Sequence, residues 1–397
     1  MDLTDVYRAE YGRCVATLTR LLGDIGLAEE AVQDAFAVAM TKWEAGGLPP
    51  NPGAWIVTTA RNRAIDRLRR ESTREARHAQ ALLLQTPDEP DEEVGPVRDD
   101  QLRLIFTCCH PALSPLAQTA LTLRLLGGLE VPEIARAFVV PEATISQRIV
   151  RAKKKIRDAR IPYRVPGEAE LPDRLPPVLT VIYLIFNEGY AATTGPLLRT
   201  DLTAEAVRLA RALADLMPDE PEVLGLLALL LLVEARRPAR VGPAGELVTL
   251  TEQDRTLWDR ELIAEGHELV RRCLRRDRPG PYQIQAAINA VHTDGEATDW
   301  AQVLALYDQL LRVTPTPIVA LNRAVALAEV HGPAAALAVV EELDIPGYHL
   351  LPATRAELLV RLGRPDKARE AYDEALALAG NDTERAFLRD RRAGLGA

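Results

Sequence analysis

Residues 141–157 read PEATISQRIVRAKKKIR, and this stretch determines the architecture that we expect around it. Its apolar residues recur at helical spacing, at Ile145, Ile149, Ala152 and Ile156. An apolar stripe of this kind must face a core, so the opposite side of the helix is held outward. That outward side carries a run of basic residues toward the C-terminal end.

The residues before this helix complete a helix-turn-helix pattern. Ser114 supplies an N-cap and Pro115 a first turn for a preceding helix, which ends at Gly127 and Gly128. A short helix over residues 132–138 and a tight turn over 139–141 follow. Helix-turn-helix spacing of this kind is typical of modules that place their second helix in the major groove of DNA.

The outward side chains of residues 141–157 differ between the two ends of the helix. Short or bidentate hydrogen-bonding side chains near its start suit base edges, and cations near its end suit phosphates. Base-edge contacts are predicted from Glu142, Thr144, Ser146, Gln147 and Arg148. Phosphate contacts are predicted from Arg151, Lys153, Lys154 and Lys155. The alternative is a helix that serves packing alone.

A second basic cluster, ARNRAIDRLRR, covers residues 60–70. On a helix Arg63, Arg67 and Arg70 share one face, and apolar residues line another. Just before the cluster, Trp43 and Trp55 flank a Gly/Pro loop. Aromatic rings beside arginines suit unpaired bases, which stack on the rings while the cations hold the backbone. The alternative is a solvated arginine face above two core tryptophans.

The composition of the 397 residues favours a soluble, mainly helical protein of several domains. Apolar residues make up 47% and aromatic residues only 5%, which excludes a collagen, a wholly disordered chain and an aromatic-rich β-sandwich. The net charge is −9, but residues 1–160 contain 22 basic and 22 acidic side chains, so the deficit lies in the remainder. Overall acidity therefore does not argue against a nucleic-acid site in the first part.

The compartment that we expect is the cytoplasm. The first residues lack the basic flank and apolar run of a secretory signal. The most apolar segment, residues 223–233, is shorter than the roughly 20 residues that span a bilayer, and it predicts a buried helix. Four sparse cysteines, at positions 14, 108, 109 and 273, suit a reducing compartment.

The back half of the chain has a repeated helical pattern. With Gly363 as an inter-helix glycine, small and aromatic residues fall where paired helices of a tetratricopeptide unit touch, at Ala356, Ala368, Tyr372 and Ala375. A weaker copy surrounds Gly332, and we expect three to five helical pairs. Before the repeats, residues 86–100, TPDEPDEEVGPVRDD, have almost nothing apolar and predict a solvated linker.

The order of three stretches resembles regions two and four of bacterial sigma factors of the extracytoplasmic-function (ECF) group. They are DIGLAEEAVQDAFAVAMTKW (24–43), NPGAWIVTTARNRAIDRLRR (51–70) and the helix-turn-helix, and the likeness covers residues 4–160. LRLIFTCCHPALSP (102–115) and NEGY (187–190) resemble the subgroup with a long C-terminal tetratricopeptide-like extension.

The resemblance implies an all-α chain with four parts. Residues 1–80 would form sigma region two, 81–100 an acidic linker, 101–160 sigma region four and 161–397 a tetratricopeptide-like domain. It also implies a dissociable RNA polymerase subunit that recognises a promoter and helps to open it. Its partners would be the β′ coiled coil of the core enzyme and promoter DNA, both double-stranded and locally unpaired.

Residue by residue, the resemblance assigns three contact sets. The polymerase-docking set is Glu29, Glu30, Gln33, Asp34 and Phe36, where acids beside an exposed aromatic suit a basic coiled coil. The set that captures the unpaired minus-ten strand is Lys42, Trp43, Asn51, Trp55, Arg61, Asn62, Arg63, Arg67 and Arg70. The helix over 144–151 corresponds to the reader of the minus-thirty-five element.

No metal, cofactor or enzymatic centre is predicted. Cys108, Cys109 and His110 suggest zinc, but a site needs about four ligands and no further cysteine motif lies nearby, so buried thiols beside a turn are the alternative. The other histidines are scattered and pair with no evident nucleophile.

Two stretches of the back half remain open to two interpretations. FNEGYAATTG (186–195) and VHTDGEATDWAQ (291–302) mix acids, amides and an aromatic at a helix boundary. They either line a ligand or partner pocket or cap helices while Tyr190 and Trp300 pack inward, and capping is the interpretation that we favour. Stacked helical pairs typically leave a groove for a peptide or protein.

Three functions are compared. The first is a promoter-specificity subunit whose C-terminal domain regulates it, through a protein partner or by folding back over a basic helix. The alternative is a polymerase-independent helix-turn-helix regulator with a ligand- or protein-sensing helical tail. An enzyme within residues 180–310 is the third, and it lacks a converging acid, base or metal set.

Overall fold

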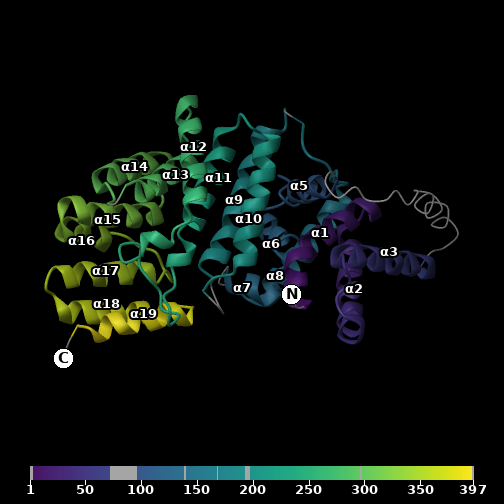
Figure 1. Ribbon diagram of the computed structural model, residues 1–397, viewed down its shortest axis with the longest axis horizontal. Helices are drawn as coiled ribbons and strands as arrows, with labels where there is room; N and C mark the ends of the chain where they lie inside the picture. Colours follow the sequence, from purple (N-terminus) through teal and green to yellow (C-terminus); the bar gives the residue numbers. More distant parts are fainter. Residues whose placement is uncertain are drawn as a thin grey trace. The chain divides into compact units, whose positions relative to one another are not determined.

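The computed structural model describes residues 3–71, 96–137, 140–167, 169–192, 197–295 and 297–395. Within these ranges the regular structure is helical and no strand occurs, so the all-α prediction is confirmed (Figure 1). The chain divides into two compact units, residues 1–185 and 186–397. The division comes later than the predicted boundary at residue 161 because α9 (Leu171–Tyr190) begins in the first unit, where Arg174 Nη2 donates to the Phe106 carbonyl at 2.5 Å.

The first three helices form an N-terminal bundle: α1 (Leu3–Leu22), α2 (Ile25–Gly46) and α3 (Pro52–Glu71). Local signals set their ends. The Asp24 side chain caps α2 by accepting from the Leu27 amide at 2.8 Å, and Gly47 ends that helix with a φ of 76°. Asn51 then caps α3 by accepting from the Ala54 amide at 3.0 Å.

Four helices that the structure describes after residue 95 form the helix-turn-helix domain: α5 (Pro96–Cys108), α6 (Pro115–Leu125), α7 (Val131–Ala137) and α8 (Glu142–Asp158). The predicted succession of helices is confirmed, with Pro115 in the first turn of α6. Residues 138 and 139, where the short helix and the turn were predicted to meet, lie outside the described residues. The four apolar residues that fixed the orientation of α8 are all buried, as predicted: Ile145, Ile149, Ala152 and Ile156.

One part of the predicted linker is wrong. Helix α5 starts at Pro96, so the last residues of the acidic run are helical, and Asp100 is buried rather than solvated. It is retained there because its carboxylate accepts from Arg20 Nε at 2.8 Å and from Arg103 Nη1 at 3.5 Å. Residues 81–95 of the predicted linker lie outside the described residues.

The second unit is a succession of helices in which neighbours along the chain pack on one another (Figure 1). The helices are α10 (Thr200–Leu216), α11 (Pro221–Glu234), α12 (Arg260–Arg276), α13 (Pro281–Thr293), α14 (Trp300–Val313), α15 (Pro317–His331), α16 (Pro333–Glu341), α17 (Leu350–Arg361), α18 (Pro365–Leu378) and α19 (Asp382–Ala393). Two 3-10 turns lie between α11 and α12: η1 (Arg237–Ala239) follows α11 and η2 (Arg255–Leu257) precedes α12.

The tetratricopeptide register is confirmed at the end of the chain. Gly363 joins α17 to α18 with a φ of 66°, a conformation that favours glycine. The residues predicted to touch between the paired helices are buried: Ala356, Ala368, Tyr372 and Ala375. Gly332 separates α15 from α16 in the same way, with a φ of 86°.

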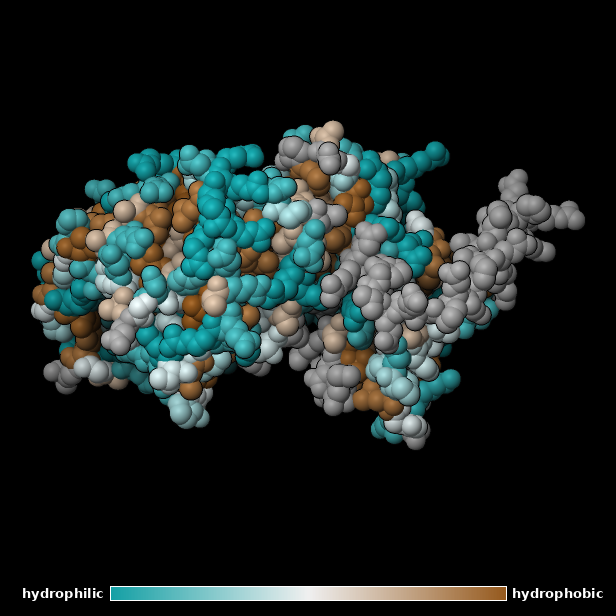
Figure 2. Space-filling model, turned by 45° about the horizontal axis from the view of Figure 1, so that its top comes forward, coloured by the Kyte–Doolittle hydropathy of each residue, from teal (hydrophilic) through white to brown (hydrophobic). Residues whose placement is uncertain are grey.

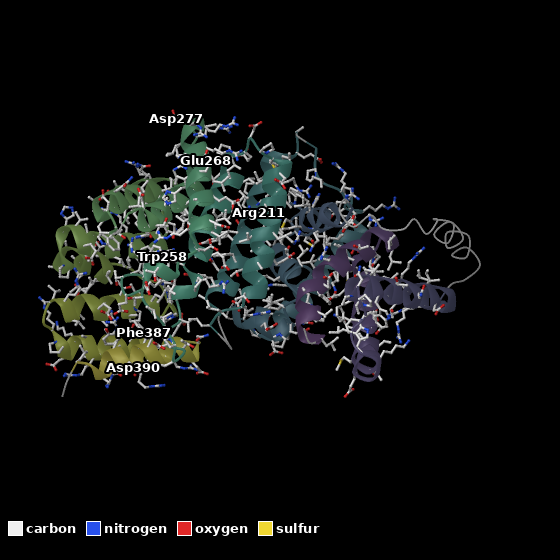
Figure 3. All side chains as sticks on the ribbon, viewed as in Figure 1. Arg211, Trp258, Glu268, Asp277, Phe387 and Asp390 are labelled. Carbon is white, nitrogen blue, oxygen red and sulfur yellow. The ribbon has the colours of Figure 1, made fainter. Side chains whose placement is uncertain are left out.

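The predicted buried helix is α11, which is apolar on all sides and covered by α12 and α13. Gly225 permits a close approach, since a Cβ there would lie 2.7 Å from the Gln283 backbone nitrogen. The Glu222 carboxylate caps α13 by accepting from the amides of Tyr282 and Gln283 at 3.1 and 3.2 Å. Arg211 of α10, labelled in Figure 3, donates to Glu265 of α12 at 2.7 Å.

The last helix is connected to the beginning of the second unit. Asn381, the N-cap of α19, is buried, and its Nδ2 donates to the Ala192 carbonyl at 2.9 Å. Arg391 of α19 also pairs with Glu252 at 2.6 Å. The two ends of the unit are therefore in direct contact.

The surface of the second unit is mixed in character. Figure 2 shows apolar residues in small groups among hydrophilic ones. Large apolar side chains that stay exposed include Leu274 and Ile318. In the part of the chain that the structure describes, no helix combines the length and apolarity needed to cross a bilayer.

Candidate nucleic-acid interface

Helix α8 presents most of its predicted DNA contacts to solvent. Thr144, Arg148 and Lys153 are half-buried. The Arg148 guanidinium is only partly available, because its Nη1 is buried and finds no hydrogen-bond partner among the described residues. The exposed members are Glu142, Ser146, Gln147, Arg151, Lys154 and Lys155.

The polar side chains of α3 differ in how far they are exposed to solvent. Asn62 and Arg63 are exposed, whereas Arg61 and Arg67 are half-buried. Arg67 is engaged in an ion pair with Glu30 of α2. Lys42 and Asn51, which precede the helix, are exposed, and the side chain of Arg70 lies outside the described residues.

The two tryptophans of the predicted minus-ten site pack on each other. Their ring centroids are 5.2 Å apart at an interplanar angle of 62°, the edge-to-face arrangement that aromatic pairs prefer. Trp43 is only 9% exposed and its indole nitrogen is buried without a described partner, so it is a core residue here. Trp55 is half-buried and keeps part of its ring accessible.

The polymerase-docking set on α2 separates into exposed and buried members. Glu30, Gln33 and Asp34 are exposed and form an acidic ridge. The prediction that Phe36 is an exposed aromatic beside these acids is wrong. Phe36 is 5% exposed because its ring packs against Tyr7 and Tyr11 of α1, with centroids 4.9 and 6.3 Å away.

Glu29 is the other buried member, at 5% exposure, and it lies between the N-terminal bundle and the helix-turn-helix domain. Its Oε1 accepts from Arg124 Nε of α6 at 2.9 Å and from Gln33 Nε2 at 3.2 Å. Its Oε2 pairs with the Lys153 ammonium of α8. We call Glu29, Arg124 and Lys153 the Glu29 cluster.

The Glu29 cluster joins a predicted polymerase contact to a predicted DNA contact. Burial raises the pKa of the neighbouring Tyr11 phenol well above its usual range, so this hydroxyl stays protonated and donates to Glu29 Oε1 at 3.5 Å. Arg124 was not predicted as a functional residue. Its sequence signal is only a lone cation within the apolar run of α6, LTLRLL over residues 121–126.

The chain matches two sigma-factor families in the regions just described. Residues 6–74 match the family model Sigma-70 region 2, and residues 103–156 match Sigma-70, region 4. The ECF RNA polymerase sigma factor SigK of Mycolicibacterium vanbaalenii is 30% identical over 159 residues, which are 38% of this chain and 78% of that protein. The chain belongs to the ECF sigma factors.

Two further relatives and one structure extend the comparison. An uncharacterised protein of Rhizobium meliloti, R00370, is 45% identical over 95% of this sigma factor and 92% of its own length. The probable ECF sigma factor SigI of Mycobacterium tuberculosis is 28% identical, over 39% of this chain and 54% of SigI. Residues 174–274 match a family of unknown function, DUF6596. A tetratricopeptide protein of Thermus thermophilus aligns with 49% of this chain and 91% of its own, at 20% identity and a TM-score of 0.36.

Region two and region four of the sigma factor are in direct contact. A Cβ on Gly12 of α1 would lie 2.5 Å from the Leu126 carbonyl oxygen after α6, so the two backbones touch there. Tyr163 donates to the Ala16 carbonyl at 2.8 Å and the Asp100 carbonyl at 2.9 Å, and thereby bridges α1 and α5. A cleft of about 310 Å³ between the α1–α2 turn and the end of α8 is lined by Asp24, Lys153, Arg157 and Tyr163, among others.

The cysteines of the sigma factor match the buried-thiol interpretation. Cys14, Cys108, Cys109 and Cys273 are all free and buried. Burial raises the pKa of Cys109 to about 12, which keeps it a thiol at neutral pH. Nowhere in the described ranges do three His, Cys, Asp or Glu side chains converge as ligands for a metal ion.

Proposed function

We propose that this ECF sigma factor directs core RNA polymerase to specific promoters through three surfaces. The acidic ridge of α2 binds the β′ coiled coil, α3 holds the unpaired minus-ten strand, and α8 reads the minus-thirty-five element. The observation that carries the proposal is the orientation of α8. Its buried apolar stripe directs Ser146 and Gln147 outward at one end and Lys154 and Lys155 at the other, in the order that base-edge and phosphate contacts require.

Promoter opening in this proposal uses binding energy alone. Stacking of an unpaired base on an aromatic ring contributes about 1–3 kcal/mol. Trp55, whose ring is partly accessible, is the aromatic that we assign to this role, with Trp43 supporting it from the core. The exposed Asn62 and Arg63 then hold the displaced strand by its backbone. In a bacterium this work takes place in the cytoplasm, where the chromosome lies.

The proposal requires region two and region four to separate. Glu29 cannot dock on polymerase, nor Lys153 on a DNA phosphate, while the two pair with each other. The closed arrangement therefore competes with both partners. Binding to core polymerase must supply the free energy that separates the Glu29 cluster and rehydrates its charges.

The C-terminal helical domain regulates this activity in our proposal. Stacked helices provide a broad surface for a protein partner or for an intramolecular contact with the DNA-binding helices. Removal of residues 186–397, one compact unit, should change promoter-specific transcription in reconstituted reactions. Unchanged transcription would assign the domain a role outside initiation.

The primary test is reconstitution with core polymerase that lacks sigma. The full chain should co-purify with the core enzyme and give transcripts from specific start sites on fragmented genomic DNA. The double charge reversal Glu30→Lys and Asp34→Lys should abolish both results. Glu44→Lys, at an exposed acid later on the same helix, is the matched control and should leave them intact. Operator binding that is indifferent to polymerase and to the double reversal would instead indicate a polymerase-independent regulator.

A further inference from the structure

A buried arginine of the C-terminal unit has no counter-ion among the residues that the structure describes. Arg236, just after α11, is 7% exposed, and its Nη2 donates to Asn289 Oδ1 of α13 at 2.5 Å. Its Nε is buried and has no hydrogen-bond partner in the described ranges. No carboxylate oxygen of the described residues lies within 4.0 Å of its guanidinium. An unpaired buried charge is strongly unfavourable, so this position calls for an anion.

Two further arginines approach the same position. The Arg240 guanidinium lies over the Tyr190 ring at 4.3 Å, and its Nε is also buried without a partner in the described part of the chain. The Arg255 guanidinium lies over Trp258 at 4.8 Å and donates to the Gly295 carbonyl at 2.9 Å. Burial is the main cause that lowers the pKa of Arg236; Tyr190 and Tyr307 oppose this shift, and the charges of Arg240 and Arg255 add to it. All three arginines therefore lie on the chain between α11 and α12, with Arg236 buried and Arg240 and Arg255 half-buried.

A buried histidine beside these arginines carries no charge at neutral pH. His292 is 8% exposed, packs edge-on against Trp300 with centroids 5.4 Å apart, and contacts Thr298 Oγ1 through Nδ1 at 3.3 Å. Burial lowers the pKa of His292 to about 4, and the nearby Arg236 and Arg255 contribute to the shift. The region around Arg236 is therefore positive, with neutral hydrogen-bonding groups at its edge.

This region unites the two stretches that the sequence left open. Residues 186–195 supply Tyr190, and residues 291–302 supply His292, Trp300 and the Gly295 carbonyl. The irregular segment between α11 and α12 supplies the arginines and Trp258, which is labelled in Figure 3. The end of this segment is attached to the C-cap of α11 by a hydrogen bond from the Asp259 amide to the Ala235 carbonyl at 2.9 Å. Residues 193–196 and 296 lie outside the described residues.

We infer that Arg236, Arg240 and Arg255 form a binding site for a small molecule that carries an oxyanion group, a phosphate or a carboxylate. Planar guanidinium groups bind both oxyanions with paired hydrogen bonds. The burial of Arg236 and His292 favours a small molecule over a peptide or a nucleic-acid backbone, which need an open surface. The inference goes beyond promoter recognition and does not depend on it.

The test is calorimetric titration of the full chain, without polymerase or DNA, with sodium phosphate and separately with sodium succinate. Ionic strength is matched with sodium chloride. One of the two probes should bind saturably at a single site, and the one that binds identifies the oxyanion as phosphate or carboxylate. Arg236→Gln should weaken that binding at least tenfold. Arg237→Gln is the matched control, because the neighbouring Arg237 is paired with Glu234 at 2.6 Å, and it should bind as the unaltered chain does.

Thermal unfolding without added anion provides an independent readout. Arg236→Gln should leave the melting temperature unchanged or raise it, since the substitution removes an unpaired buried charge. If that variant does not fold, the less buried Arg240→Gln takes its place in the titration. Binding of neither probe, or equal binding by the unaltered chain and the Arg236 or Arg240 variant, which would indicate an adventitious ion only, would overturn the inference.

Discussion

Replacing Gly12 by alanine should weaken the contact between region two and region four. The added Cβ would lie 2.5 Å from the Leu126 carbonyl oxygen and 3.1 Å from the Leu126 Cα. Both atoms belong to backbone, so neither can rotate away, and the two regions must move apart by roughly 1 Å to restore an ordinary contact. Overpacking of this kind typically costs about 1–3 kcal/mol.

The cost appears as a change in polymerase affinity. In the closed form region two and region four are in contact, and in the open form they are separated. If the closed form predominates in the free sigma factor, a cost of about 1–3 kcal/mol to that form raises the open population about 5- to 150-fold. Only the open form exposes Glu29, so the apparent Kd for core polymerase should fall by up to the same factor. Within the isolated region-two bundle the substitution has the opposite effect on stability, because alanine favours a helix by roughly 0.5–1 kcal/mol over glycine.

The assay is a fluorescence-anisotropy titration of labelled sigma factor with core polymerase. Gly46→Ala serves as the control, because no atom lies within 4 Å of a Cβ at that helical position, and its Kd should match that of the unaltered chain. Circular dichroism confirms that each variant is folded. A Gly12→Ala chain that is folded yet binds core with unchanged or lower affinity would refute the closed-form reasoning.

Three further outcomes are expected. Arg148→Ala should relax sequence preference at the upstream promoter element by about 1–3 kcal/mol per base pair contacted, measured as binding to single-base variants of that element. Lys154→Ala should weaken binding to all promoters alike and reduce the slope of log K against log salt by about 1; a base-dependent loss would contradict its assignment to phosphate. The pKa of His292 is lowered from 6.5 to about 4 in the folded chain. The neutral imidazole therefore contributes to the free energy of unfolding above pH 6.5, and this contribution is lost as the pH falls toward 4. Stability should therefore decline by about 3 kcal/mol over that window, and His292→Gln should remove this part of the decline in pH-dependent urea unfolding.

The features predicted correctly from sequence are those encoded by neighbours along one helix. The orientation of α8 follows from four apolar positions within twelve residues, and their spacing alone fixes which side is buried. The register around Gly363 is equally local, since the small and aromatic residues of α17 and α18 lie within 20 positions of one another. Local periodicity therefore predicted helix orientation and pairing.

The features that were missed depend on distant partners. Glu29 is buried because it meets Arg124, 95 residues away, and nothing in the helical pattern of α2 indicates that encounter. Phe36 occupies the position of an exposed aromatic by sequence, but tyrosines on α1 cover it. Asp100 was placed in the linker by the composition of its neighbours, whereas a hydrogen bond from Arg20 retains it in the fold. Tertiary contacts decide which acidic side chains are buried, and the composition of the sequence does not reveal those contacts.

The back half shows the same limit for a candidate site. Helix capping was the favoured interpretation of residues 186–195 and 291–302, and Asp299 does cap α14 by accepting from the Gln302 amide at 3.0 Å. Trp300 is only partly buried, against His292. The arginines that bring the two stretches into one region come from a third segment, which carried no recognisable motif.

The hydrogen bond from Asn381 to Ala192 makes the second unit a ring of contacts rather than an open-ended spiral. An open stack loses terminal pairs one at a time and tolerates gain or loss of a unit at its end. In the second unit the N-cap of α19 also contacts the beginning of the unit at Ala192, so deleting this helix removes contacts from both ends of the unit. Such a domain should melt in a single step, and its length should be fixed by closure rather than by repeat number.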